Sequence, residues 1–180
     1  MTTDDLKKAL TGVMKGEVSD DATILKGASR DTSIFTRMPE LVVYPKDAED
    51  VSAMVKEIHR ARGAGAVVSL AARSGGTDMT GGPLTTSVVV SFTKHMNHLG
   101  EVGDDFAVTE PGVYYRDFEK ETLKKNLILP SYPASRSIAA MGGIVANNSG
   151  GERTLKYGQT ERYIEELDVV RSDGSQTTFK

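Results

Sequence analysis

The chain has 180 residues, which is enough for one domain with a substantial hydrophobic core. Its net charge of −3 gives no electrostatic reason to bind nucleic acid, and no apolar run is long enough to span a bilayer. The absence of cysteine excludes disulfides, thiolate nucleophiles and cysteine-ligated iron–sulfur clusters within this chain. The acidic, polar N-terminus lacks the features of a secretory signal, so we expect a cytoplasmic protein, free or peripheral to a membrane.

The first forty residues predict one helix followed by an irregular segment. Apolar side chains at helical spacing indicate an amphipathic helix over residues 3–15, with Gly16 as its stop. We expect this helix to serve packing. Residues 17–40 are polar and aperiodic, and we expect no regular structure there.

A strand–helix–strand unit is expected next. Residues 41–44 form a short β-prone run that ends at Pro45. Asp47 is placed to cap a helix whose apolar stripe continues to Ile58. Residues 66–70 predict the second strand, which completes a βαβ-like unit.

The following half of the chain predicts two more strands and a helix. Apolar runs at residues 87–92 and 106–109 indicate the strands. Residues 115–124 indicate the helix, with Phe118 and Leu123 facing inward.

A hairpin is expected at the end of the sequence. Residues 167–170 predict a strand, Asp173-Gly174 predicts a turn, and residues 177–179 begin the returning strand. Because the sequence stops inside this hairpin, we expect the chain to be a truncated fragment.

A glycine-rich loop follows the strand expected at residues 66–70. It reads Arg73-Ser74-Gly75-Gly76-Thr77-Asp78-Met79-Thr80-Gly81-Gly82. Adjacent glycines can adopt positive φ and leave their N–H groups unobstructed, so several of these groups can converge on one anion. Ser74 and Thr77 add hydroxyl donors. The loop therefore has the parts needed to hold a pyrophosphate.

Two common nucleotide motifs do not fit this loop. No Gly-Lys-Ser/Thr ends it, as a Walker A motif would require, and it does not follow the G-x-G-x-x-G pattern. A glycine-rich turn without a ligand stays open as the alternative.

A second stretch, residues 133–151, is dominated by small side chains. Such a surface allows a flat ring system to approach the backbone closely. Asn147 and Asn148 offer both donors and acceptors to a ring of this kind. Close packing of a helix on a strand also favours Ala and Gly, and it is the alternative interpretation.

Taken together, the two stretches resemble a known cofactor-binding domain. The order Arg-Ser-Gly-Gly-Thr-x-x-x-Gly-Gly, Pro-Ala-Ser, Met-Gly-Gly-Ile-Val-Ala-Asn-Asn-Ser-Gly-Gly and Lys156-Tyr157-Gly158 is similar to the FAD-binding domain of the vanillyl-alcohol oxidase superfamily. The resemblance is strongest to the branch that contains D-lactate dehydrogenases and the glycolate oxidase FAD subunit. It extends from about residue 30 to the end of the chain.

The resemblance implies an α+β fold of the PCMH type, with two small sheets, flanking helices and FAD lying between the sheets. Residues 31–180 would form this FAD-binding domain, truncated before the cap or substrate domain. Residues 1–30 would provide an N-terminal helix and a lead-in.

The resemblance also implies which residues contact FAD. The glycine-rich loop would wrap the pyrophosphate, Pro-Ala-Ser would lie beside the flavin, and the Gly-Gly pair with its following small residues would reach the cofactor. The residue just before the late strand would touch FAD through its main chain. The implied residues are Arg73, Ser74, Gly75, Gly76, Thr77, Asp78, Gly81, Pro133, Ala134, Ser135, Gly142, Gly143, Ala146, Asn147, Gly150, Gly151 and Ile164.

Three departures from the family pattern qualify these expectations. Ala140 stands where the family often has Thr, which removes one hydroxyl contact. Asp78 stands where Gly is common, and its carboxylate should either point away from a pyrophosphate or weaken its binding. No histidine occurs between Arg73 and Pro83, so non-covalent FAD is expected.

The implied parent enzyme oxidises a small 2-hydroxy acid, of the D-lactate or glycolate type, by hydride transfer to FAD. Its substrate would be held by the missing cap domain, so the catalytic residues are unknown. An iron–sulfur electron-transfer subunit is implied as a partner. The alternatives are a related FAD-dependent reductase of a cell-wall precursor, which would oxidise NADPH, and a non-catalytic flavin-binding module.

Other side chains are given structural roles. His95 and His98 are three residues apart, but no third metal ligand lies near them in the sequence, so no metal site is expected. Tyr114 and Tyr115 are expected to pack in the core or at its edge. Tyr132 is next to the expected flavin segment, and both core packing and ring stacking stay open for it.

Overall fold

The computed structural model describes all 180 residues, which form two compact units. The first unit comprises residues 1–73, 78–91 and 166–180, and the second comprises residues 74–77 and 92–165. The chain therefore passes from the first unit to the second, and back again, within the glycine-rich loop.

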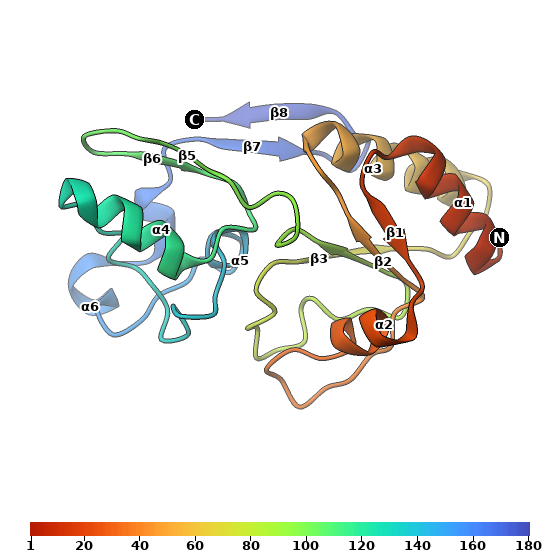
Figure 1. Cartoon of the computed structure of the whole chain (residues 1–180), viewed down its shortest axis with the longest axis horizontal. Coiled ribbons are helices and arrows are strands. Elements are labelled where there is room, and N and C mark those ends of the chain that lie inside the picture. The colour runs from red at the N-terminus through yellow and green to blue at the C-terminus, as the bar shows by residue number, and fades with distance from the viewer. The chain divides into compact units, whose positions relative to one another are not determined.

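The first unit is built on a four-stranded sheet with the order β1-β2-β4-β3 (Figure 1). Its central strands β2 and β4 are parallel, as are β4 and β3, whereas β1 runs antiparallel to β2. The strands are β1 (Glu17–Ser19), β2 (Leu41–Tyr44), β3 (Leu70–Arg73) and β4 (Val88–Ser91).

Helices cover both faces of this sheet. Helix α2 (Ala22–Ala28) packs on Val42 and Val89, and Figure 1 shows α1 (Thr3–Val13) and α3 (Ala48–Gly63) on the other side. Because side chains alternate along a strand, a strand covered on both faces must be apolar throughout. This requirement explains the unbroken aliphatic runs of β2 and β4.

The expected strand–helix–strand unit is confirmed in its order, but one strand is displaced. The Asp47 side chain accepts a hydrogen bond from the Asp50 amide at 2.9 Å and caps α3 as predicted. The strand expected at residues 66–70 instead starts at Leu70, so its predicted start is wrong by four residues. Leu70 pairs with Val88, the first residue of β4, so the register between the two strands begins there. Of the two valines expected in this strand, Val67 is exposed and Val68 is buried.

The prediction of an irregular segment over residues 17–40 is wrong in its first half. Residues 17–19 form β1, and α2 follows. One carboxylate oxygen of Asp21 accepts hydrogen bonds from the Thr23 and Ile24 amides, which caps α2. Both elements are too short to show a period, and they depend on the neighbouring β2 for packing and pairing.

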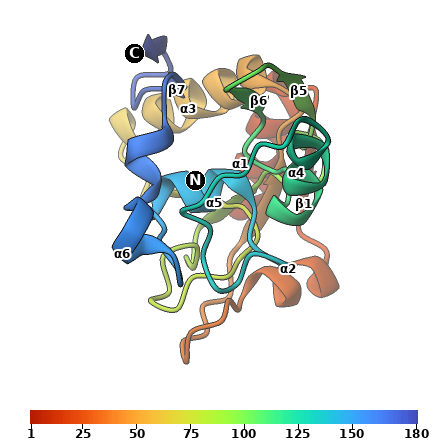
Figure 2. The same cartoon turned by 90° about the vertical axis from the view of Figure 1, so that its left-hand side faces the viewer.

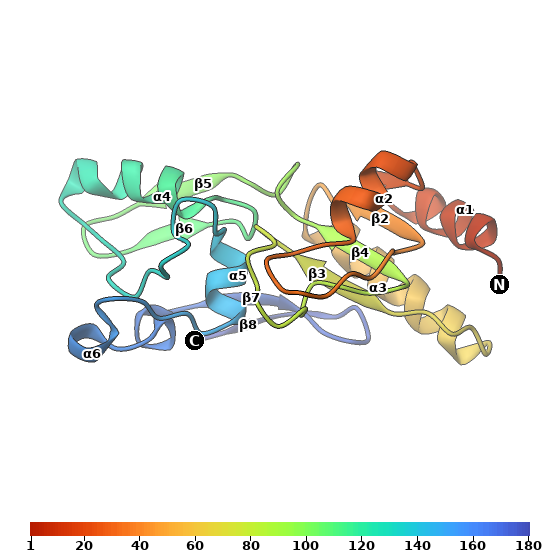
Figure 3. The same ribbon diagram turned by 90° about the horizontal axis from the view of Figure 1, so that it is seen from below.

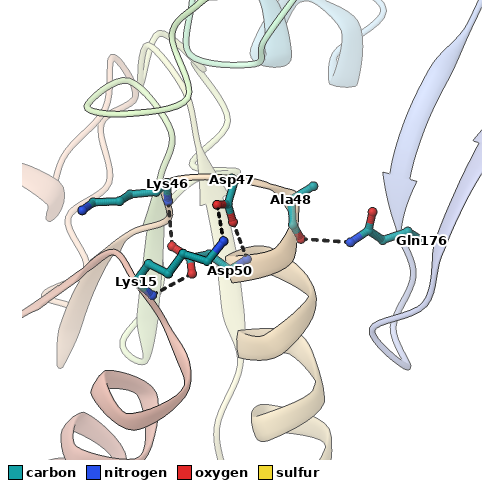
Figure 4. Close-up of polar contacts among 6 residues, drawn as sticks. All are labelled: Lys15, Lys46, Asp47, Ala48, Asp50 and Gln176. Carbon is teal, nitrogen blue, oxygen red and sulfur yellow. Dashed lines mark hydrogen bonds and ion pairs between the residues drawn. The ribbon is translucent and has the colours of Figure 1, made fainter.

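A buried carboxylate fixes the start of α3 (Figure 4). The side chain of Asp50 is 1% exposed and accepts hydrogen bonds from the backbone amides of Lys15, at 2.7 Å, and Lys46, at 2.9 Å. A Cβ at Gly16 would collide with the Tyr44 carbonyl oxygen. The segment after α1 is therefore held directly against the first turn of α3.

The C-terminal hairpin has the predicted turn and belongs to the first unit. Strands β7 (Leu167–Val170) and β8 (Gln176–Phe179) pair antiparallel. Gly174 in the turn has a φ of 80°, and its carbonyl accepts a hydrogen bond from the buried Ser52 hydroxyl at 2.5 Å. The hairpin is thereby fixed to α3.

Replacing Gly174 with alanine should lower the free energy of unfolding by about 2 kcal/mol, because a side chain is strained in the left-handed region. The added Cβ would also lie 2.9 Å from the Ser52 carbonyl oxygen and collide with the Lys56 side chain. Urea unfolding measures the change. Gly63→Ala is the matched control, since no atom lies within 4 Å of a Cβ at Gly63. Equal midpoints for the two variants would contradict the expected strain.

The second unit contains one short sheet and several short helices. Strands β5 (Leu99–Val102) and β6 (Ala107–Thr109) pair antiparallel, and β5 was not expected from the sequence. The helices are α4 (Tyr115–Thr122), the 3₁₀ helix η1 (Leu123–Lys125), α5 (Met141–Ala146), α6 (Thr154–Tyr157) and the 3₁₀ helix η2 (Thr160–Tyr163).

The core of the second unit lies around α4 and α5 (Figure 2). Phe118 is buried there as predicted. Leu123 is 53% exposed, so its predicted inward position is wrong, because α4 ends at Thr122 and the chain then tightens into η1. Tyr132 is 2% exposed, with its ring centroid 5.7 Å from that of Tyr115. Tyr132 is therefore a core residue, which answers the question left open by the sequence.

The helices and strands confirm the predicted α+β class. The strands form three hydrogen-bonded sheets: the four-stranded sheet and the hairpin in the first unit, and the β5–β6 pair in the second. None of the helices combines the length and the apolar character needed to cross a bilayer.

Candidate functional site

The first half of the glycine-rich loop, residues 74–77, lies against the start of α5 within the second unit. The Ser74 hydroxyl donates a hydrogen bond to the Pro111 carbonyl oxygen at 2.5 Å. The Gly142 amide donates to the same oxygen at 2.9 Å. One carbonyl oxygen thus joins the two stretches that the sequence singled out.

Gly75 sits where no side chain fits. A Cβ at this position would lie 2.6 Å from the Ile138 carbonyl oxygen and 3.0 Å from the Ala140 nitrogen. Both neighbours are backbone atoms, which cannot rotate away as a side chain can. The loop can therefore approach α5 this closely only because residue 75 is glycine.

The backbone of this half-loop has donors available for a ligand. The amides of Gly75 and Gly76 donate no hydrogen bond within the protein, and Gly76 has a φ of 66°. Successive free N–H groups around a residue of positive φ form a concavity that suits an anion. The Ser74 hydroxyl is already used by Pro111, so the loop offers mainly backbone donors.

The second half of the loop belongs to the first unit and is organised by Asp78. One Asp78 carboxylate oxygen accepts hydrogen bonds from the Gly82 amide at 2.6 Å, the Thr80 hydroxyl at 2.7 Å and the Thr80 amide at 3.0 Å. These bonds, led by that from Gly82, hold the pKa of the Asp78 carboxyl below its ordinary value of 3.8. The negative charge is thus compensated by the loop itself.

The side chain of Arg73, the first residue of the loop, is oriented by a main-chain carbonyl group. Its Nη2 atom donates to the Arg30 carbonyl oxygen at 2.8 Å. Gly81, near the exit of the loop, has a φ of 87°, a conformation that favours glycine.

Helix α5 presents small residues on its outer side. Met141 and Ile144 are buried in the core, whereas Gly143 and Ala146 are exposed. Three other residues that the sequence predicts to contact the cofactor follow the helix: Asn147, Gly150 and Gly151. Asn147 and Gly150 are exposed. Because residues three and four apart share a helical face, α5 gives a ligand close access to its backbone.

Two glycines of this stretch are required by the packing of the second unit. A Cβ at Gly142 would lie 2.6 Å from the Pro111 Cβ atom, and a Cβ at Gly151 would collide with the Tyr132 carbonyl oxygen. Close packing, the alternative interpretation of this stretch, therefore accounts for these two positions. It does not account for Gly143, where the nearest contact of a Cβ would be an ordinary 3.6 Å.

The remaining predicted residues lie in turns of the second unit. The Pro133 carbonyl accepts from the Arg136 amide at 3.0 Å, and the Ser135 carbonyl accepts from two later amides. Ala134 between them is exposed. Ile164 follows η2, three residues before β7, and is half-buried.

The histidines form no metal centre with other ligands. No group of three or more His, Cys, Asp or Glu side chains is arranged to hold a metal ion. The His98 side chain is 87% exposed, with Nδ1 3.9 Å from the nearer Glu110 carboxylate oxygen.

Comparison with known proteins identifies the family. The family model described as "FAD binding domain" matches residues 39–180. Glycolate oxidase subunit GlcD of Bacillus subtilis is 33% identical over 180 residues, covering 97% of this chain and 37% of the relative. D-lactate dehydrogenase of Archaeoglobus fulgidus is 32% identical over 136 residues, covering 74% and 29%. D-2-hydroxyglutarate dehydrogenase of Stutzerimonas stutzeri is 31% identical over 176 residues, covering 95% and 36%.

Solved structures share the fold at lower identity. Alkyldihydroxyacetonephosphate synthase matches with a TM-score of 0.83 at 20% identity, covering 100% of this chain and 38% of that one. Xylooligosaccharide oxidase from Myceliophthora thermophila matches with a TM-score of 0.79 at 19% identity, covering 97% and 36%. The chain thus spans little more than a third of the length of these proteins.

The residues present fit the cofactor that the family binds. FAD carries a pyrophosphate, and the loop provides free amides at Gly75 and Gly76 with an approach that excludes a Cβ. The exposed small residues of α5 leave room for a flat ring system. From the family match, the relatives and the fold together, the chain belongs to the FAD-binding domain family of the vanillyl-alcohol oxidase (PCMH-type) flavoproteins.

Proposed function

We propose that this chain is the FAD-binding part of a dehydrogenase that oxidises a small 2-hydroxy acid. Three relatives are named for glycolate, D-lactate and D-2-hydroxyglutarate, and each of these compounds is a 2-hydroxy acid. The observation that carries the cofactor assignment is the pair of free amides at Gly75 and Gly76, in a loop that packs closely on residues 138–140.

The proposed roles follow from the hydrogen bonds that each residue already makes within the protein. The amides around Gly75 and Gly76 would bind the pyrophosphate, with Thr77 adjoining them. Asp78 and Gly81 would shape the second half of the loop. Ser74 and Arg73 would position the loop, since their side chains donate to Pro111 and Arg30.

The flavin end of FAD would be held by the second unit. We assign Pro133, Ala134 and Ser135 to the edge of the ring and the exposed face of α5 to close backbone contact with FAD. Ile164 would add a main-chain contact. Bound FAD would accept the hydride from the substrate, and the protein would orient the flavin and exclude water.

The cofactor should be bound without a covalent link. No histidine lies between Arg73 and Pro83, and the chain has no cysteine. After hydride transfer, electrons would pass from FAD to another acceptor, and we propose an iron–sulfur subunit as the partner that receives them. Denaturing the purified holoprotein should release all flavin into solution, and flavin retained on the unfolded polypeptide would contradict this assignment.

Replacing Asp78 with asparagine should weaken FAD binding about tenfold, the effect of losing roughly 1.4 kcal/mol of charge-assisted hydrogen bonding. Since the pKa of Asp78 is lowered in the folded loop, its contribution is complete above the ordinary value of 3.8 and is lost as the pH falls through the lowered pKa. Asp78→Asn should therefore lack part of the acid-dependent loss of affinity. FAD titrations at several pH values measure both effects.

Asp105→Asn is the matched control for Asp78→Asn. Asp105 is an exposed aspartate between β5 and β6 whose side chain makes no hydrogen bond. Its variant should bind FAD as the wild type does at every pH. An unchanged affinity in Asp78→Asn would show that the loop keeps its form without the carboxylate.

The proposed reaction is tested by anaerobic reduction of the FAD-loaded full-length protein. Glycolate, D-lactate or D-2-hydroxyglutarate should bleach the visible absorption of the oxidised flavin, with formation of the matching 2-oxo acid. Reduction by NADPH, with no response to any hydroxy acid, would instead support the cell-wall precursor reductase. Bound FAD that no donor reduces would support a non-catalytic flavin-binding module.

A further inference from the structure

A segment ahead of the family match runs alongside the glycine-rich loop. Residues 30–35 precede the region matched by the FAD-binding family, which begins at residue 39. Figure 3 shows this orange segment beside the yellow-green second half of the loop. Both belong to the first unit, together with Arg73.

Three contacts connect the segment to the loop. The Arg73 guanidinium donates to the Arg30 carbonyl oxygen at 2.8 Å, at the start of the loop. The Thr32 hydroxyl donates to the Asp78 carbonyl oxygen at 2.9 Å, in its middle. A Cβ at Gly81 would lie 3.2 Å from the ring of Phe35, so this ring faces the Gly81 backbone near the exit.

The segment is stiffened by its own side chains. The Asp31 carboxylate accepts a hydrogen bond from the Ser33 amide at 2.8 Å. The Ser33 hydroxyl accepts one from the Phe35 amide at 3.1 Å. Side-chain bonds to an amide two residues later restrict the backbone in successive turns. The segment is thus suited to hold the loop in one conformation.

We propose that residues 30–35 are a positioning element for the cofactor loop, with the Thr32 hydroxyl as its main attachment. The inference rests on the proposed assignment of that loop to the FAD pyrophosphate. A loop that is ordered before binding loses less conformational entropy when the ligand arrives. Thr32 fixes the main chain of Asp78, whose side chain in turn fixes Thr80 and Gly82.

The test compares Thr32→Val, which removes only the hydroxyl, with Thr32→Ser, which keeps it. Thr36→Val is the matched control, since Thr36 lies in the same stretch, is exposed and makes no hydrogen bond. Thr32→Val should bind FAD about fivefold more weakly, as expected for the loss of one hydrogen bond. Thr32→Ser and Thr36→Val should bind FAD as the wild type does, and the melting temperature of the cofactor-free protein should be unchanged in all three.

Hydrogen exchange of the cofactor-free protein provides a readout independent of FAD. The Thr80 and Gly82 amides are held by Asp78, so their exchange should accelerate in Thr32→Val and not in Thr32→Ser. Unchanged exchange and unchanged affinity in Thr32→Val would overturn the positioning role while leaving FAD binding intact. Failure of the wild type to bind FAD would overturn the proposed function, whereas faster exchange in Thr32→Val would still show that Thr32 holds the loop.

Discussion

Replacing Gly75 with alanine should weaken FAD binding about 100-fold, which corresponds to the loss of two hydrogen bonds to a charged group at roughly 1.4 kcal/mol each. The added Cβ would lie 2.6 Å from the Ile138 carbonyl oxygen and 3.0 Å from the Ala140 nitrogen. Because neither backbone atom can turn aside, the loop has to move. Its movement displaces the amides of Gly75 and Gly76, which are the donors assigned to the pyrophosphate. A fluorescence titration with FAD measures the change.

Gly12→Ala is the matched control for Gly75→Ala, because it adds a Cβ where there is space for it. No atom lies within 4 Å of a Cβ at Gly12, which is inside α1. This variant should keep wild-type FAD affinity and gain up to about 1 kcal/mol in unfolding free energy, as is usual for Gly to Ala in a helix. If Gly75→Ala binds FAD as tightly as Gly12→Ala, the loop does not hold the cofactor in the way proposed.

Replacing Asp50 with alanine should lower the free energy of unfolding by about 3 kcal/mol, because two amides lose a charged acceptor in a buried position. The Asp50 carboxylate is the partner of the Lys15 and Lys46 amides, and it also lies in the first turn of α3, where the helix dipole favours a negative charge. Figure 4 shows its position between the two backbone segments. Without it, the segment after α1 loses its buried hydrogen bond to the first turn of α3. Urea unfolding monitored by circular dichroism measures the loss.

Asp47→Ala is the control for position and charge. Asp47 caps the same helix and pairs with the exposed Lys15 ammonium at 2.6 Å, but its own side chain is 35% exposed. Loss of a helix cap should cost about 1 kcal/mol, clearly less than the loss of Asp50. Equal destabilisation in the two variants would show that burial of the Asp50 carboxylate has no special importance.

Local sequence patterns were sufficient where an element carries its own signal. Asp47 predicted the start of α3 because a cap and its helix are neighbours in the chain. Asp173-Gly174 predicted the hairpin because the turn requires a residue of positive φ, which Gly174 provides. These features depend on residues a few positions apart.

Elements that depend on distant partners were misplaced or missed. The start of β3 is set by its register with Val88, eighteen residues away, so no local pattern marks it. The strand β5 exists through its pairing with β6 and was not expected. Leu123 has the side chain of a core residue, yet the end of α4 at Thr122 turns it outward.

The candidate site likewise combines features that the sequence shows with contacts that only the fold shows. The glycines of the loop are visible in the sequence, and so is the resemblance that assigns them to FAD. The sequence cannot show that Ser74 and Gly142 share the Pro111 carbonyl oxygen, or that Thr32 binds the Asp78 main chain. Such contacts join residues that are 31 to 46 positions apart, and only the folded chain brings them together.

The most direct test of FAD binding is a visible absorption titration of the purified protein with FAD. We expect saturable binding and a shifted flavin spectrum relative to free FAD, with the titration midpoint raised about 100-fold in Gly75→Ala and unchanged in Gly12→Ala. A full-length protein that folds correctly, contains no flavin and shows no saturable change on adding FAD would contradict the assignment of the glycine-rich loop.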